Sequence, residues 1–262
     1  MSAIRKINLH ILAHLSCLNK AFIWFALGKG GGARQNEFMS LPVPILITNF
    51  KAYQESTGAN AVELAKLHER IANELGVHFA VAGQAMDLMM LAASVSIPVF
   101  AQHVDGIGYG AYTGSVPVEI AHNIGVDGSM LNHSECRISD RQIEAALEDL
   151  KKLGMLSLVC AENDEEGHKF ALMGADFIAI EPPELIGGDI SVSTAQPDLI
   201  RRSVEKIGPG KVIVGAGVKS AEDVRIALQL GAVGVLVASG VVKAADPMAA
   251  LRQFALGLKG NS

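Results

Sequence analysis

From residue 43 onward, the sequence alternates between short apolar runs and segments with helical patterning. The runs are rich in Val, Ile, Leu and Phe, which is typical of buried parallel strands. They read VPILITNFK, VHFAVAG, PVFAQHVD, GSMLNHSE, LSLVCAEN, FIAIEPPE, KVIVGAGV and GVLVASGVV. A strand followed by a helix, repeated eight times, predicts a parallel sheet whose strands are joined by helical crossovers.

The helical segments carry recognisable start signals. Ser139 and Gln142 have the spacing of a capping box, in which each side chain accepts a hydrogen bond from the other's backbone N–H. Ser220 has the position of an N-cap, and Asp246 and Pro247 fit the N-cap and the first helical position. The segment MDLMMLAASV has the weakest pattern of the expected helices.

Eight equal units most simply close into a (β/α)₈ barrel, and we expect residues 39–262 to form this barrel as a single α/β domain. An open, doubly wound sheet is the alternative, but such a sheet rarely needs eight equal units. Half of the residues are apolar and the chain has 27 glycines, a composition that suits a buried parallel sheet with tight turns.

Residues 1–38 differ from the rest of the chain. Their apolar stretch is interrupted by His10, His14 and Lys20, too often for a transmembrane helix. A Gly-rich stretch, GKGGGARQNEF, follows it and resembles a linker. We expect an N-terminal extension that is disordered or loosely held, with a targeting segment as the alternative.

The net charge of −5 gives no electrostatic reason to expect binding to nucleic acid or to a membrane. The three cysteines show no CxxC spacing, so the sequence predicts no zinc site and no disulfide framework. This reduced pattern is typical of an intracellular protein, and we expect a cytoplasmic location.

Polar residues gather at the carboxyl ends of the expected strands, where such barrels have their active sites. Lys51 follows the first strand, His133 the fourth and Glu181 the sixth. The last two strands end in small residues, GAG (215–217) and ASG (238–240), which let backbone N–H groups approach an anion. A lysine, a histidine and a carboxylate beside such a cradle indicate proton transfer on a phosphorylated carbonyl compound.

The motifs NFKAY, AQHVD, LNHSE, IAIEPPELIGG, VGAGV and VLVASGVV occur in this order, each at a strand end. Together they resemble triosephosphate isomerases in their short archaeal form, over residues 43–256. The resemblance implies the interconversion of D-glyceraldehyde 3-phosphate and dihydroxyacetone phosphate through an enediolate, in glycolysis and gluconeogenesis, without a metal or another cofactor.

The family's residue roles follow by position. Glu181 resembles the catalytic base and His133 the neutral electrophile; these are known properties of the family rather than inferences from this chain. Lys51 resembles the cation that holds the substrate, and Glu135 resembles a carboxylate that stands behind this lysine. The remaining residues that the resemblance assigns to substrate binding are Asn49, Phe50, Ile186, Gly217, Ala238 and Ser239.

Two further segments resemble functional parts of the family. Ile186 and Gly187 match its mobile lid, where Asp189 places a carboxylate in a position that relatives fill with Gly; we expect this side chain to turn outward, away from the phosphate. The segment GIGYGAYTGSVP resembles the loop that docks into a neighbouring subunit, with Thr113 and Gly114 near the other active site. We therefore expect a homo-oligomer, and a tetramer rather than a dimer.

Two other functions fit the same residues. His103 and Asp105, together with His133, could seed the metal site of a pentulose-phosphate epimerase. A barrel retained only for binding phosphosugars is the second alternative, although a pure binder would not need the base Glu181. Metal analysis and an isomerase assay distinguish these alternatives.

Overall fold

The computed structural model describes residues 40–185 and 191–260. Within these ranges the strands close into one parallel barrel in chain order, from β1 to β8. The strands are β1 (Ile45–Asn49), β2 (His78–Gly83), β3 (Val99–Ala101), β4 (Gly128–Leu131), β5 (Leu156–Ala161), β6 (Phe177–Ile180), β7 (Val212–Val214) and β8 (Gly234–Val237). Every strand predicted from an apolar run is present.

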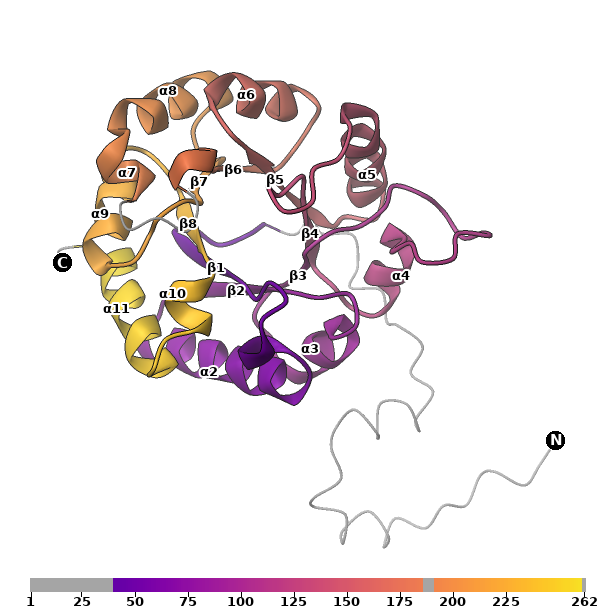
Figure 1. The fold of residues 1–262 in the computed structure, drawn as a ribbon, viewed down its shortest axis with the longest axis horizontal. Helices are drawn as coiled ribbons and strands as arrows, with labels where there is room; N and C mark the ends of the chain where they lie inside the picture. The colour runs from indigo at the N-terminus through magenta and orange to yellow at the C-terminus, as the bar shows by residue number, and fades with distance from the viewer. Residues whose placement is uncertain (1–39, 186–190, 261–262) are drawn as a thin grey trace, which may run out of the picture. The chain divides into compact units, whose positions relative to one another are not determined.

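Helices surround the strands as an outer ring (Figure 1). They are α2 (Ala59–Leu75), α3 (Leu88–Ser94), α4 (Val118–Asn123), α5 (Asp140–Lys152), α6 (Asp164–Leu172), α7 (Val192–Ala195), α8 (Pro197–Ile207), α9 (Ala221–Gln229), α10 (Ser239–Val242) and α11 (Pro247–Lys259). Among the described residues, two units contain two α-helices instead of the expected one. The sixth contains α7 before α8, and the eighth contains the one-turn helix α10 before α11.

The first strand closes the barrel by pairing on both sides. Ile45 lies opposite His78 of β2 and also opposite Gly234 of β8. All the pairs around the ring are parallel. The predicted (β/α)₈ barrel is therefore confirmed, and the doubly wound alternative is wrong because such a sheet has two open edges.

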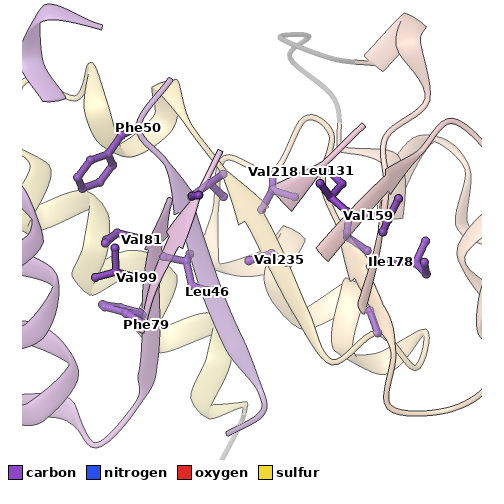
Figure 2. Close-up of a cluster of buried hydrophobic side chains, with 14 of the residues drawn as sticks. Leu46, Phe50, Phe79, Val81, Val99, Leu131, Val159, Ile178, Val218 and Val235 are labelled. Carbon is purple, nitrogen blue, oxygen red and sulfur yellow. The ribbon is translucent and has the colours of Figure 1, made fainter. Parts of the chain in front are cut away.

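Strand residues face alternately into the barrel and out toward the helices, because successive side chains of a strand point to opposite faces. Ile45 and Ile47 belong to the inner cluster, whereas Leu46, between them, belongs to the outer one. Part of the outer cluster, which the helices cover, is shown in Figure 2. Each fully buried large apolar side chain stabilises the fold by about 1.5–3 kcal/mol. The inner and outer clusters together therefore fix the positions of the strands whose ends carry the site.

The predicted helix starts are confirmed. The Ser139 N–H donates to Gln142 Oε1 at 3.0 Å, and the Gln142 N–H donates back to Ser139 Oγ at 3.4 Å. Ser220 forms a second capping box, and the Asp246 side chain caps α11 with Pro247 in its first turn.

Several sequence-based expectations lie outside the described residues. They concern the extension 1–38 and the lid residues Ile186, Gly187 and Asp189. In the part of the chain that the structure describes, no helix combines the length and the apolar character needed to cross a membrane.

Candidate active site

A pocket opens at the carboxyl ends of the strands, and most of the predicted site residues line it. They are Asn49, Lys51, His133, Glu181, Gly217, Ala238 and Ser239. Phe50 differs, because its side chain is fully buried in the outer hydrophobic cluster and does not line the pocket. We therefore assign Phe50 to the core rather than to substrate binding.

Lys51 follows β1 in a left-handed backbone conformation, with a φ of 47°. Side chains do not favour this region, so neighbouring hydrogen bonds must hold it. Asn49 Oδ1 accepts from the Lys51 N–H at 2.9 Å and from Gln102 Nε2 at 3.1 Å. The Lys51 ammonium then reaches Glu135 Oε1, 2.6 Å away. The turn therefore aims a cation into the pocket and partly neutralises it.

His133 is placed by a second strained residue. Asn132 has a φ of 59°, and its side chain donates to the Cys160 carbonyl at 3.1 Å and accepts from the Ile138 N–H at 3.2 Å. These bonds tie the loop after β4 to β5. As a result, His133 is buried and points into the pocket.

The surroundings of His133 favour its neutral form. The Glu135 backbone N–H donates to His133 Nδ1 at 3.1 Å, so Nδ1 is the acceptor and the proton lies on Nε2. Burial lowers the pKa of His133 below its ordinary value, and the Lys51 charge lowers it further. Glu135 Oε2, 3.8 Å from Nδ1, would pair only with a protonated ring. The nearer backbone donor fits the neutral ring better.

Glu181 follows β6, and its backbone N–H donates to the Ala161 carbonyl at 2.8 Å. Its side chain lies over Gly215, where an added Cβ would be 2.5 Å from Glu181 Cγ. Burial raises the pKa of Glu181 to about 7, and the adjacent Cys160 thiol offsets only part of this effect. Among the described residues, Glu181 Oε2 has no hydrogen-bond partner. This oxygen is free to accept a proton.

The residues predicted to bind an anion lie on the β7 and β8 side of the pocket. Gly217 turns after β7 with a φ of 69°, and α10 begins at Ser239 directly after Ala238. The first N–H groups of a helix have no acceptor within that helix, so they can donate to an anion. The pocket thus combines a base, a neutral hydrogen-bond donor, a cation and an anion cradle, which together can isomerise a phosphorylated carbonyl compound.

The alternative metal site has a different geometry from the one expected. β3 ends at Ala101, so His103 and Asp105 lie beyond the strand, where His103 Nε2 contacts Asp105 Oδ1 at 3.3 Å. Within residues 40–185 and 191–260, no three His, Cys, Asp or Glu side chains are grouped to hold a metal ion.

Comparison with known proteins decides the family. The sequence pattern of the triosephosphate isomerase family matches residues 44–255. The triosephosphate isomerase of Methanothermus fervidus is 46% identical over 196 residues, which cover 73% of this chain and 88% of the relative. The chain belongs to the triosephosphate isomerase family. The triosephosphate isomerase of Methanocaldococcus jannaschii is 43% identical over 195 residues, covering 73% of this chain and 89% of that protein.

The fold agrees with this family. The crystal structure of triosephosphate isomerase from Bartonella henselae matches with a TM-score of 0.64 at 17% identity. The match covers 81% of this chain and 99% of the other. At this low identity, the likeness supports the barrel fold alone.

Sequence reasoning missed several residues that shape the triosephosphate isomerase pocket. Tyr53 and Lys219 line it, Gly215 makes room for Glu181, and Gln102 fixes Asn49. Tyr53 lies within the NFKAY motif and Gly215 within GAG, so both belong to motifs that the sequence itself indicates. What they contact, however, depends on packing between distant strands.

Proposed function

We propose that Glu181, His133 and Lys51 carry out the isomerisation performed by this family. The activity is the interconversion of D-glyceraldehyde 3-phosphate and dihydroxyacetone phosphate, a step of glycolysis and gluconeogenesis. The observation that carries the residue assignment is the 3.9 Å separation between His133 Nε2 and Glu181 Oε1. The carbonyl oxygen of a bound substrate can therefore lie beside His133 Nε2 while the neighbouring carbon lies beside Glu181 Oε1.

The proposed reaction moves one proton between two carbons and the hydroxyl proton between the two oxygens that these carbons carry, the latter through His133 Nε2. Glu181 removes the proton from the carbon beside the carbonyl, and His133 Nε2–H donates a hydrogen bond to the oxygen that becomes negatively charged. The Lys51 ammonium stabilises the same charge. Protonated Glu181 then returns the proton to the adjacent carbon, which its pKa of about 7 favours because a base near the working pH both takes and releases a proton readily.

The described residues on either side of the loop after Glu181 support a role for this loop in closing the pocket. Pro182 and η3 (Pro183–Leu185) lead into it, and the Val192 N–H donates to the Ala216 carbonyl at 3.1 Å where the chain returns. Both anchors lie near the pocket. We assign Ile186 to the lid that excludes water, which would protect the enediolate from losing its phosphate.

Purified protein tests the function directly. Isomerisation of glyceraldehyde 3-phosphate is measured with a coupled dehydrogenase, before and after chelation. Activity that survives chelation supports the proposal, whereas activity that needs a metal favours the epimerase alternative. Phosphate binding without turnover would favour the binding-protein alternative.

Association is part of the proposal. Tyr109 and Tyr112 are exposed large side chains on the loop that also contains Thr113 and Gly114. Exposed aromatic residues on one loop are typical of an interaction surface. We assign this loop to contact with a second copy, in a tetramer rather than a dimer and in the cytoplasm. Analytical ultracentrifugation of the full chain measures the state.

A further inference from the structure

Lys243 lies at the end of α10, the helix that contributes to the anion cradle. Its Nζ is 4.2 Å from the centre of the Tyr53 ring. Tyr53 lines the pocket and belongs to the segment after β1. The contact therefore spans the junction of the first and last strands, and it places an ammonium group at the edge of the pocket.

The ring beneath Lys243 is held in place. The Tyr53 carbonyl accepts hydrogen bonds from Thr57 Oγ1 at 2.8 Å and from the Ser56 N–H at 3.1 Å. The Tyr53 side chain also packs against the outer hydrophobic cluster. Because an aromatic face attracts a cation, this fixed ring restrains an otherwise flexible lysine beside the pocket.

The charges around the pocket indicate a role for the Lys243 ammonium. Lys51 is paired with Glu135 at 2.6 Å, which partly offsets its charge, whereas Lys243 forms no ion pair with any residue in the described ranges. The chain as a whole has a net charge of −5, which repels a phosphate dianion. An uncompensated cation beside the cradle opposes that repulsion where the substrate enters.

We propose that Lys243, restrained by the Tyr53 ring, is a specificity-determining residue that draws dianionic phosphorylated substrates into the pocket. It acts on capture and not on the proton transfer, because the phosphate has the same charge in the substrate and in the transition state. This proposal rests on the isomerase function proposed above.

The test is the dependence of kcat/KM on ionic strength in full-length protein. Removing one charge that acts through water changes the capture of a dianion by about 2- to 4-fold at low salt. The difference should vanish near 0.5 M salt, since the screening length falls from about 10 Å at 0.1 M to a few ångströms. For Lys243→Gln, we expect this loss in kcat/KM with kcat unchanged. Lys243→Arg should restore the wild-type salt dependence.

Lys169 provides a matched control. Its Nζ also lies over a ring, 4.8 Å from the centre of Phe170, but Lys169 does not line the pocket, and it pairs with Asp140 at 2.8 Å. Lys169→Gln changes the net charge by the same amount, and it should leave the salt dependence as in the wild type. Both side chains are exposed, so folding of both variants is expected and is checked by melting temperature.

Competitive inhibition by inorganic phosphate gives a readout that does not depend on turnover. Its inhibition constant should rise by about 2- to 4-fold in Lys243→Gln at low salt, in parallel with the loss of kcat/KM. An unchanged constant and an unchanged kcat/KM would overturn the proposal for Lys243. A loss that persisted at 0.5 M salt would also overturn it, because that loss would be structural. A wild-type protein without isomerase activity would instead contradict the proposed function.

Discussion

His133 Nε2 and Glu181 Oε1 lie 3.9 Å apart, although the two residues follow strands β4 and β6, which are separated by β5. Burial shifts both pKa values, and it does so in opposite directions because in each case it favours the uncharged form. The pair therefore does not form an imidazolium–carboxylate ion pair, which would leave neither group available for catalysis. A neutral donor and a titratable base face the same space.

The first prediction concerns the base. Glu181→Gln retains the shape of the side chain but cannot accept the proton, so kcat should fall by about 10²–10⁴-fold. The anion cradle stays intact, and the inhibition constant for inorganic phosphate should change little. Steady-state kinetics of the purified variant measure both values. A variant that kept more than a tenth of the wild-type kcat would remove Glu181 from the mechanism.

The second prediction follows from the pKa of about 7 at Glu181. The base acts only when it is ionised, so kcat/KM should fall as the pH decreases through about 7. His133 should not contribute a second limb near pH 6.5, since its pKa lies below its ordinary value. A profile that remained flat from pH 8 to pH 5.5 would contradict the raised pKa.

The raised pKa of Glu181 also predicts that replacing this residue stabilises the folded protein at high pH. The folded chain holds the Glu181 proton more tightly than the unfolded chain, so this group stabilises the fold fully below about pH 4.5 and loses its contribution as the pH rises to about 7. The loss is on the order of 3 kcal/mol. Glu181→Gln should thus be more stable than the wild type at pH 8, with a smaller difference at pH 5. Urea unfolding at the two pH values measures this, and equal differences would contradict it.

The strands, the helix starts and the edge of the barrel that holds the site follow from local sequence patterns. The capping box of Ser139 and Gln142, for instance, involves residues three positions apart. The contact of Lys243 with Tyr53 and the space that Gly215 leaves for Glu181 join residues on different strands. Neither contact has a local pattern. The pKa values of His133 and Glu181 also depend on burial, which only the closed barrel creates.

The third prediction concerns Gly215. An alanine Cβ at this position would lie 2.5 Å from Glu181 Cγ and 2.9 Å from Oε1, so the carboxylate must move. A displacement of about 1 Å can reduce the rate by about 100-fold. We expect Gly215→Ala to lower kcat strongly while the phosphate inhibition constant stays near the wild-type value. Unchanged kcat would show that Glu181 does not need its present position.

The fourth prediction concerns acid stability. His68 of α2 is fully buried against β1, with Nδ1 2.7 Å from the Leu64 carbonyl and Nε2 2.8 Å from Thr48 Oγ1. The carbonyl can only accept, so the Nδ1–H donates and the hydroxyl of Thr48 donates to Nε2. Burial lowers the pKa of His68 from 6.5 to about 4. The unfolded chain therefore binds this proton first, and stability falls as the pH decreases from 6.5 to about 4.

Replacing His68 tests how much of the loss of stability at acidic pH is due to this ring. In His68→Gln the part of the pH dependence due to this ring, on the order of 3 kcal/mol, should be absent, although the variant is less stable at pH 7.5. His122→Gln, at an exposed position of α4, serves as the control and should retain the wild-type dependence. Urea unfolding at pH 7.5, 5.5 and 4.5 measures all three proteins. A parallel decline in His68→Gln and the wild type would assign the acid sensitivity to other groups.

The last prediction concerns residues 1–38, which lie outside the described part of the chain. β1 pairs with both β2 and β8, so the barrel has no open edge for an upstream strand. The Gly-rich stretch before Met39 would give little preorganisation to a docked segment. A protein that begins at Met39 should therefore match the full chain in kcat/KM and in melting temperature. A melting temperature lower by more than about 5 °C, which corresponds to about 1–2 kcal/mol for a domain of this size, would show that the extension contributes to the fold.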